Sequence, residues 1–345
     1  MDDDLRSITA IILAAGQGTR MKSSLPKVLH QVAGKPLVIH AIENTQSIIT
    51  EKPVVVIGHG ADQVRIAVGD RARFAIQHPQ LGTAHAVQAA KEVLADFQGL
   101  ILVFYADMPL FTKETMQRLV NTQCNNPGVM TMLSVFMDDP HGFGRVVRNS
   151  NGSVQAIVEE AQADAEIRKI HELNVGAYCF RSEWLWNALD RIKVSPKGEY
   201  YLTDTVELAV RENQRVECVV LDDPQEAIGI NTRVHLAEAE AIMRRRINQR
   251  WMLSGVTMID PETTYIDQDV ILDPETIIYP NTHLYGNTHI STGCKIGPSV
   301  YLWNTVIENN CTLGPEVAIR NTTVKANQTI QFAMMDDDHN NLDIE

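Results

Sequence analysis

The chain is poor in the residues that build disulfide or metal frameworks. Its 345 residues include five cysteines, and no two of these have C-x-x-C spacing. The eleven histidines likewise form no H-E-x-x-H pattern. Zinc ribbons and thioredoxin-like redox chemistry are therefore not expected. Buried free thiols, which behave as small core residues, are the ordinary interpretation of these cysteines.

Positive charge and long apolar runs are also scarce. The sequence contains 30 Lys and Arg residues and 43 Asp and Glu residues, which gives a formal net charge of −13. This balance argues against broad binding to nucleic acid or to an anionic membrane. The apolar run at residues 8–15 is far too short to span a bilayer, and acidic residues precede it. We expect a cytoplasmic protein, although a local cation cluster with a metal can still hold a small anion.

One stretch near the start indicates such an anion site. Residues 11–21 read IILAAGQGTRM, and LPK follows at residues 25–27. The apolar run predicts a buried strand that opens into a glycine loop, whose backbone amides can face an anion, with Arg20 and Lys27 beyond it. Met21 stands where a dinucleotide fingerprint and a Walker loop each require glycine. The layout favours a nucleoside triphosphate site of another type.

The first 230 residues alternate between strand-like and helix-like segments. Apolar runs at Val54–Ile57, Leu100–Tyr105 and 129–136 predict strands, and residues 84–94 and 113–120 have helical spacing. This alternation predicts an α/β fold with a Rossmann-like, mostly parallel sheet covered by helices on both faces. Gly16 and Asp107 both come directly after strands. We therefore expect them at the carboxyl edge of the sheet, where ligands bind in such folds.

A long helix and a periodic region follow. Residues 233–254 contain neither Pro nor Gly and stop at Gly255, which predicts one helix. Its Arg244–Arg246 run is interpreted as a solvated face. Aliphatic residues then recur at every sixth position: Ile266, Leu272, Ile278, Leu284, Ile290, Ile296 and Leu302, with small or β-branched residues one phase away. After a one-residue slip the pattern resumes at Ile307, Leu313 and Ile319. This period is typical of a parallel β-helix, here with room for three to four coils.

These patterns predict four parts of the chain. Residues 1–231 form a nucleotide-binding domain, 232–255 a linker helix, 256–331 a short β-helix of hexapeptide repeats, and 332–345 a disordered acidic tail.

Further motifs occur in the order found in one enzyme family. They are Gln77 and Gln80, LGTAHA at 81–86, YAD at 105–107, GFGR at 142–145, Glu159, Asn174, GEYYLTD at 198–204 and GIN at 229–231. With the glycine loop, they make the chain resemble the bacterial N-acetylglucosamine-1-phosphate uridyltransferases, which are usually fused to a glucosamine-1-phosphate acetyltransferase. The resemblance covers roughly residues 8–330.

The resemblance implies a UDP-N-acetylglucosamine diphosphorylase. The enzyme would join UTP and N-acetylglucosamine 1-phosphate into UDP-N-acetylglucosamine and pyrophosphate with Mg²⁺, to supply peptidoglycan and other cell-wall precursors. The resemblance also implies a left-handed β-helix and a homotrimer. The reaction needs positioning and electrostatic stabilisation but no general base, because the attacking phosphate is already ionised.

One set of residues is expected at the nucleotide. Backbone amides from Leu13 through Ala14, Ala15 and Gly16 to Gly18 should cradle the nucleotide. Arg20 should bind the β- and γ-phosphates with its planar fork, and Lys27 should neutralise the reacting phosphates. The resemblance assigns Gln77, Gln80, Gly82 and Thr83 to the uracil end. A glutamine amide suits a uracil edge because it both donates and accepts, although an exposed loop residue is the alternative interpretation.

The metal and sugar ends follow. Asp107 and Asn231 are the candidate Mg²⁺ ligands, since magnesium takes few protein oxygens and keeps waters and substrate phosphates. An Asp after a strand is otherwise a common turn or cap residue. Asp107 is also assigned to catalysis with Arg20 and Lys27. The positions that match the family's sugar site are Tyr105, Gly144, Glu159, Asn174, Tyr201 and Thr203.

The chain departs from the family pattern in two ways. Ala84 and Ala106 stand where the family has glycine; alanine is strained there if φ is positive and tolerated if φ is ordinary. The basic, histidine and tyrosine residues of the family's acetyltransferase site have no counterparts after Ile330, so acetyltransferase activity is predicted to be absent. The alternatives left open are a nucleotidyltransferase for glucose 1-phosphate or dTTP and a non-catalytic scaffold or regulatory relative.

Overall fold

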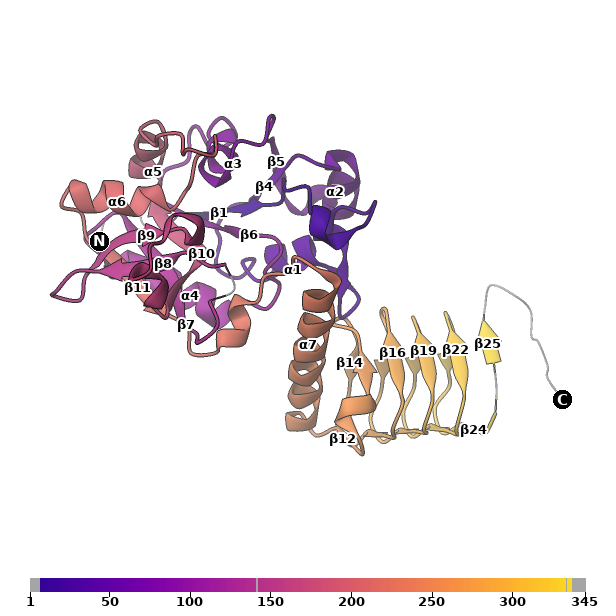
Figure 1. Cartoon of the computed structure of the whole chain (residues 1–345). Helices are drawn as coiled ribbons and strands as arrows, with labels where there is room; N and C mark the ends of the chain where they lie inside the picture. Colours follow the sequence, from indigo (N-terminus) through magenta and orange to yellow (C-terminus); the bar gives the residue numbers. More distant parts are fainter. Residues whose placement is uncertain (1–6, 141, 333, 337–345) are drawn as a thin grey trace. The chain divides into compact units, whose positions relative to one another are not determined.

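The computed structural model describes residues 7–140, 142–332 and 334–336. It divides into two compact units (Figure 1). The first comprises residues up to His30 together with Pro36–His235, and the second comprises Gln31–Lys35 and the chain from Leu236 onward. Within the described residues, no helix is both long and apolar enough to cross a membrane.

The first unit is built on one nine-stranded sheet. The main path runs in the order β11-β7-β10-β6-β1-β4-β5, and β8 and β9 attach beside β10. Strand β1 pairs in parallel with β4 and β6, whereas β10 is antiparallel to β6 and β7. The strands are β1 (Ile8–Leu13), β4 (Val54–Ile57), β5 (Arg73–Ile76), β6 (Leu100–Tyr105), β7 (Met130–Phe136), β8 (Arg145–Arg148), β9 (Val154–Val158), β10 (Glu172–Arg181) and β11 (Val216–Val220). The predicted, mostly parallel sheet is confirmed.

Helices cover both faces of this sheet. Side chains alternate along β1, so that Ile12 enters one apolar core and Ile11 enters the other. The first core packs against α1 (Leu37–Glu43), α2 (Ala61–Val68) and α4 (Lys113–Asn125). The second packs against α3 (Thr83–Ala89), α5 (Ser182–Leu189) and α6 (Asp204–Arg211). The sheet is thus the middle layer of three.

One predicted helix is shorter than expected. The spacing at residues 84–94 predicted helix throughout, but α3 ends at Ala89. The chain then continues in tighter turns, in which the Ala90 amide bonds the Val87 carbonyl at 3.0 Å and the Lys91 amide bonds the Gln88 carbonyl at 3.0 Å. Leu94 still reaches the core, which explains the helical spacing of the apolar residues.

Helix α7 (Arg233–Leu253) follows the prediction for residues 233–254 and ends before Gly255, whose φ is +96°.

The second unit also takes in residues 31–35, which belong to the pair β2 (Gln31–Val32) and β3 (Lys35–Pro36). The Ala33 amide donates to Glu240 Oε2 at 2.8 Å, and the Ala33 carbonyl accepts from the Gln268 amide at 3.0 Å. No feature of the sequence indicated this excursion.

The rest of the second unit is a series of short parallel strands in three sheets. Their orders are β12-β15-β18-β21-β24, β13-β16-β19-β22-β25 and β14-β17-β20-β23. The bounds are β12 (Thr257–Met258), β13 (Tyr265–Ile266), β14 (Ile271–Leu272), β15 (Ile277–Ile278), β16 (His283–Tyr285), β17 (His289–Ile290), β18 (Lys295–Ile296), β19 (Tyr301–Trp303), β20 (Val306–Ile307), β21 (Thr312–Leu313), β22 (Ala318–Arg320), β23 (Thr323–Val324), β24 (Thr329–Ile330) and β25 (Met334–Asp336). The short β-helix is confirmed, and it is consistent with the left-handed form.

The six-residue period explains this unit. Every aliphatic residue of the predicted series from Ile266 to Ile319 is buried. Lys295 pairs with Ile277, 18 residues earlier, and Thr312 pairs with Lys295, only 17 residues earlier, as the predicted one-residue slip requires. Residues 334–336 were predicted to be disordered but form β25, because they pair with β22 in register with Ala318. Residues 337–345 lie outside the described residues.

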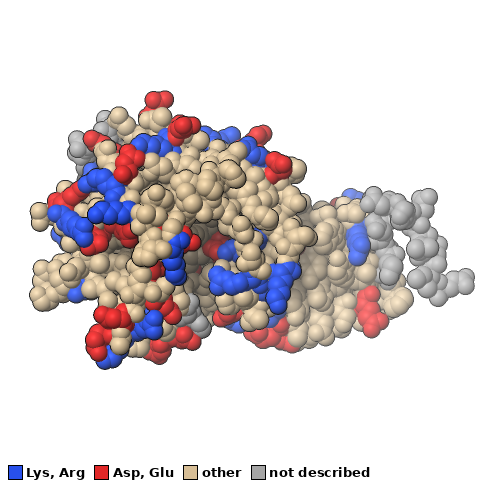
Figure 2. Space-filling view, turned by 45° about the horizontal axis from the view of Figure 1, so that its top comes forward, with Lys and Arg blue, Asp and Glu red and all other residues tan. Residues whose placement is uncertain are grey.

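Short 3-10 helices complete the chain: η2 (Thr19–Met21), η3 (Lys27–Leu29), η4 (Gly69–Arg71), η5 (Glu160–Gln162), η6 (Ile167–Lys169), η7 (Pro224–Ala227) and η8 (Pro261–Thr263). Over the face seen in Figure 2, acidic and basic side chains are interspersed. This mixed surface agrees with the expectation that a nucleotide would be held by a local cluster rather than by a broad basic field.

Candidate active site

The glycine loop and Asp107 meet at one edge of the sheet. Strands β1 and β6 are parallel neighbours, with Leu13 paired to Tyr105 at their carboxyl ends. The Ala106 amide also donates to the Leu13 carbonyl at 3.0 Å. The loop after Leu13 and the turn that holds Asp107 therefore leave the sheet side by side, as the sequence predicts.

The loop presents amides to the space beyond the strand. The Ala14 amide is not among them, because it donates to the Val56 carbonyl at 2.9 Å. Within the described part of the chain, the amides of Gly16, Gln17 and Gly18 meet no acceptor. A Cβ built on Gly16 meets nothing within 4 Å, so this side of the loop is open. The free amides can bind an anion.

The loop also fixes the path of Lys27, the first residue of η3. Gly18 has a φ of +61°, and a Cβ there would lie 2.7 Å from the Lys27 Cβ. Pro26 is held in turn by Gly60, where a Cβ would lie 2.3 Å from the proline ring. Glycine at position 18 therefore allows both the left-handed turn and the close passage of the lysine stem.

Lys27, Asp107 and Asn231 form one polar cluster. The Lys27 ammonium is ion-paired with the Asp107 carboxylate and donates to Asn231 Oδ1 at 3.1 Å. The two charged side chains are only 14% and 16% exposed. The Ile230 amide donates to the Asp107 carbonyl at 2.9 Å, which holds the Asn231 segment alongside the turn. Residues from three distant parts of the sequence thus converge on one point.

The two oxygens of this cluster fit a magnesium ion. One cation, the Lys27 ammonium, already reaches both Asp107 and Asn231. A carboxylate and an amide oxygen are hard donors, and Mg²⁺ usually takes only one or two protein carboxylates and completes its shell with water and phosphate. The described residues contain no group of three or more His, Cys, Asp or Glu side chains suited to a metal. The fit therefore concerns a metal shared with a substrate.

Arg20 lies in η2 with its side chain exposed. No salt bridge to Arg20 occurs among the residues that the structure describes. Its guanidinium thus retains its donors for a ligand.

The predicted base-binding residues are linked to the same loop. The Gln80 amide donates to the Ala15 carbonyl. Gln77 is buried, and its amide nitrogen donates to the Gly82 carbonyl at 2.9 Å and contacts His85 Nδ1 at 3.2 Å. Gln77 is therefore engaged in holding the segment that precedes α3. His85 was not singled out from the sequence, although it lies within the LGTAHA motif.

Glu159 is the centre of the predicted sugar site. The Thr203 hydroxyl donates to Glu159 Oε1 at 2.9 Å, and a Cβ built on Gly144 would lie 3.6 Å from Glu159 Oε2. Burial raises the pKa of the Tyr105 hydroxyl, and the charges of Glu159 and Asp107 raise it further. Burial also raises the pKa of Tyr201, with a smaller contribution from Glu159. These phenols stay protonated and remain able to donate.

Asn174 is buried beneath this site. The side-chain amide of Asn174 donates to the Tyr178 hydroxyl at 2.8 Å. Its backbone amide donates to the Gly144 carbonyl, also at 2.8 Å. Gly176 has a φ of +80°, and a Cβ there would lie 2.5 Å from the Tyr105 ring. Tyr178, which was not selected from the sequence, therefore helps to set the position of Asn174.

The base and sugar segments are joined to each other. The Tyr200 amide donates to the Leu81 carbonyl at 2.8 Å, and the Ala84 amide donates to the Tyr200 carbonyl at 3.0 Å. The Leu202 amide donates to the Thr83 hydroxyl at 2.9 Å. Movement of one segment would therefore move the other.

Asp204, next to Thr203, begins α6. Burial raises the pKa of its carboxyl to about 6, and the charges of Glu207 and Glu159 add to the effect. Asp204, Glu207 and Glu159 are thus close enough to influence one another next to the predicted sugar site.

The two alanines that replace the family's glycines are unstrained. Neither Ala84 nor Ala106 is among the residues with positive φ. Both are buried, and the backbone of each is hydrogen-bonded within the fold. The condition for tolerating alanine, an ordinary φ, is therefore met at both positions.

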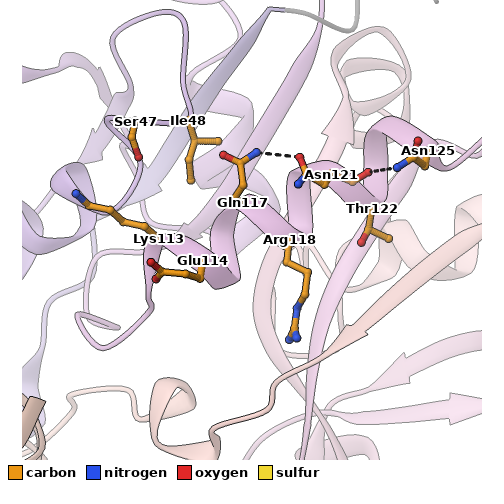
Figure 3. A pocket seen from close by; sticks show the side chains of 9 residues that line it. All are labelled: Ser47, Ile48, Lys113, Glu114, Gln117, Arg118, Asn121, Thr122 and Asn125. Carbon is orange, nitrogen blue, oxygen red and sulfur yellow. Dashed lines mark hydrogen bonds between the residues drawn. The ribbon is translucent and has the colours of Figure 1, made fainter.

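An open groove of about 540 Å³ lies elsewhere, against the outer side of α4 (Figure 3). It is lined by Ser47, Ile48, Lys113, Glu114, Gln117, Arg118, Asn121, Thr122 and Asn125. None of these belongs to the predicted site. The Arg118 side chain extends away from the helix, and its guanidinium donates to the Val220 carbonyl at 2.6 Å.

The three-layer α/β fold carries an open glycine loop beside a lysine, a carboxylate and an amide oxygen, which is the arrangement predicted for a nucleotide-binding enzyme. The sequence model of the family described as "Nucleotidyl transferase" matches residues 9–252. The chain belongs to the nucleotidyl transferase family.

Individual relatives refine this assignment. The chain is 44% identical over 263 residues to the "Bifunctional protein GlmU" of Bacillus subtilis, which covers 76% of this chain and 58% of the relative. It is 43% identical over 291 residues to the protein of the same name from Exiguobacterium sibiricum, which covers 84% of this chain and 65% of the relative. The chain thus spans about 58 to 65% of the length of these curated relatives.

A solved structure supports the fold. A crystal structure from Bacillus anthracis, described as a candidate glucose-1-phosphate thymidylyltransferase in complex with sucrose, has a TM-score of 0.56 and 20% identity. The match covers 68% of this chain and 95% of that one. At this identity the likeness concerns the fold alone.

Proposed function

We propose that the protein transfers the uridylyl group of UTP to N-acetylglucosamine 1-phosphate, forming UDP-N-acetylglucosamine and pyrophosphate. The convergence of Lys27, Asp107 and Asn231 beside the open glycine loop is the observation that carries this proposal. This arrangement brings free loop amides, a lysine ammonium and two oxygens of the kind that bind Mg²⁺ to one edge of the sheet. The sequence identity of 43 to 44% to proteins named GlmU supports the choice of substrates.

The chemistry is a direct displacement. An oxygen of the sugar phosphate attacks the α-phosphorus of UTP, and the bond from that phosphorus to the pyrophosphate oxygen breaks. The attacking phosphate is already ionised, so no side chain has to remove a proton. The enzyme's task is to hold two anions in line and to stabilise the charge that builds on the leaving pyrophosphate.

Each residue has a part in that task. The amides of residues 16–18 bind phosphate oxygens, Arg20 holds the β- and γ-phosphates, and Lys27 neutralises the reacting groups. Asp107 and Asn231 would hold Mg²⁺, which when bound supplies positive charge next to the phosphates.

The sugar and base ends set specificity. Glu159 accepts from Thr203 and has a second oxygen for the sugar, and Tyr201 lies near enough for the Glu159 charge to raise its pKa. An acceptor such as the Glu159 carboxylate suits the N–H of an acetamide or a sugar hydroxyl. Gln80, Gly82 and Thr83 form the segment proposed to meet the uracil ring.

We further propose that the β-helix assembles the protein into a trimer. Ile271 and Val306 point outward from the sheet β14-β17-β20-β23 and are 51% and 37% exposed. Exposed apolar side chains in register on one face suit contact with another copy. The cytoplasmic location and the absence of acetyltransferase activity stay predictions.

The test is pyrophosphate release with Mg²⁺ and UTP, in separate reactions with N-acetylglucosamine 1-phosphate, glucosamine 1-phosphate and glucose 1-phosphate. Rapid release with the first sugar alone is expected. Preference for glucose 1-phosphate would keep the mechanism and overturn the sugar assignment. Silence with all three, in folded protein, would favour a non-catalytic relative.

A further inference from the structure

The Lys27 ammonium is bound to the two residues that would hold a divalent cation. It touches both proposed metal ligands, through an ion pair to Asp107 and a 3.1 Å hydrogen bond to Asn231 Oδ1. With side-chain exposures of 14% and 16%, the lysine and the carboxylate are largely removed from water. The acidic ligand is thus neutralised by the protein itself.

We infer that Lys27 is a built-in placeholder that excludes the divalent cation from Asp107 and Asn231 until a triphosphate draws its ammonium away. This inference rests on the proposed function for the identity of the triphosphate, but its cation part concerns the protein alone. It predicts that metal and nucleotide bind together and that the protein without nucleotide holds metal poorly.

Electrostatics supports mutual exclusion. Two cations bound to the same oxygens repel each other strongly where water is scarce. Magnesium also requires its oxygens at about 2.0–2.1 Å, which leaves no room for an ammonium on the same carboxylate oxygen. Conversely, a buried carboxylate with no cation at all is costly. Either the lysine or the metal must therefore be present, and only one of them fits.

The surroundings permit the lysine to leave without a change of fold. The backbone of η3 is fixed, since the Leu29 amide donates to the Pro26 carbonyl at 2.9 Å and the His30 amide donates to the Lys27 carbonyl at 3.2 Å. The stem passes Gly18, and the neighbouring Gly16 faces open space. The flexible four-carbon stem of the lysine allows the ammonium to leave Asp107 by rotation about its own bonds, with the η3 backbone in place.

A consequence follows for binding. If the triphosphate frees the metal ligands, it raises metal affinity, and the metal must raise triphosphate affinity by the same factor. A nucleotide with fewer phosphates, which attracts Lys27 less, should produce less coupling.

The test measures Mn²⁺ binding to the full chain without nucleotide, by the electron paramagnetic resonance signal of free Mn²⁺. Lys27→Met keeps the length of the stem beside Gly18 and removes the charge. We expect it to bind Mn²⁺ at least tenfold more tightly than the wild type. Lys22→Met, which removes an exposed lysine of the same loop, is the matched control and should bind as the wild type does. Lys27→Gln provides a second neutral variant if Lys27→Met does not fold by circular dichroism.

The double variant Lys27→Met/Asp107→Asn tests whether the increase in Mn²⁺ affinity depends on Asp107. Its Mn²⁺ affinity should return to the wild-type level or below. Equal affinity of the wild type and both neutral variants would overturn the inference, as would a gain that persists without Asp107. These measurements need no substrate. If the neutral Lys27 variants bind Mn²⁺ more tightly but the wild type releases no pyrophosphate, the proposed function is refuted, whereas the inference that Lys27 excludes the cation stands.

Discussion

Asp107 illustrates how one residue combines a structural and a chemical task. Its carbonyl accepts the Ile230 amide, and its carboxylate faces Lys27, so the turn after β6 positions Asn231 as well as a negative charge. The carboxylate is the only charged oxygen in the proposed ligand pair. Removing the charge should therefore weaken metal binding more than it disturbs the fold.

Asp107→Asn should raise the Mg²⁺ concentration for half-maximal pyrophosphate release by about tenfold or more, because a neutral amide replaces a charged ligand. The measurement is turnover against Mg²⁺ at saturating UTP, with Asp96→Asn, an exposed acid, as the control. An unchanged Mg²⁺ dependence would remove Asp107 from the metal site.

The carboxyl group of Asp204 should make the stability of the fold depend on pH. Its pKa is about 6 in the folded chain, chiefly because of burial, and about 3.9 in an unfolded chain. Between these values the folded state binds more protons than the unfolded state, so stability falls as pH rises from about 4 to about 6. The cost of the charged form persists at higher pH.

Asp204→Asn should therefore raise the melting temperature at pH 7.5, by an amount equivalent to about 1 kcal/mol once solvent screening of this half-buried group is allowed for. Its advantage should vanish near pH 4. Thermal melts of the wild type and the variant across this range decide the matter. Parallel curves at every pH would show that the carboxyl titrates normally.

At the scale of elements, the segments before α3 and α6 act as one unit. Gly82 has a φ of +100°, and a Cβ there would lie 2.6 Å from the Tyr200 carbonyl oxygen. Any side chain at this position pushes the base segment away from the sugar segment. Gly16, by contrast, has open space around it.

Gly82→Ala should lower stability by about 2 kcal/mol, through positive φ and the clash, and should raise KM for both substrates. Gly16→Ala should leave the melting temperature unchanged and weaken UTP binding alone, since its methyl group enters the space for ligand. The pair is compared by thermal melts and by KM for each substrate. If Gly82→Ala melts like the wild type, the coupling of the two segments is wrong.

The elements also show how far sequence reasoning reaches. Strands β4 and β6 were predicted residue for residue because buried apolar runs carry a clear signal. The β-helix was predicted from its six-residue period. The end of α3 was missed because the apolar spacing continues into turns, and β25 was missed because its pairing with β22 is a long-range contact in a polar segment.

The site was predictable in the same uneven way. Gly16 and Asp107 were predicted at one edge of the sheet because each follows a strand, and the parallel pairing of β1 with β6 agrees. The Lys27 contact with Asn231 joins residues 204 positions apart and has no local signature. The assignment of residues 31–35 to the second unit could not be predicted either, because it depends on hydrogen bonds of Ala33 with Glu240 and Gln268, which are distant in the sequence.

At the scale of the whole molecule, the β-helix is proposed to bring copies together. Sedimentation equilibrium should give a trimer for the wild type. Ile271→Lys combined with Val306→Lys should lower the mass to that of a monomer, because charges replace the exposed apolar pair, while the buried six-residue series is untouched. A wild type that is monomeric at all concentrations, or a variant that remains trimeric, would exclude this face as the interface.

One site is proposed to hold a uridine nucleotide and an N-acetyl sugar together. The most direct measurement is calorimetric titration of the protein, in the presence of Mg²⁺, with UDP-N-acetylglucosamine, UDP-glucose and dTDP-glucose. We expect UDP-N-acetylglucosamine to bind at least tenfold more tightly than the other two, and Glu159→Gln to reduce that preference. Equal affinities, or tighter binding of dTDP-glucose, would contradict the account.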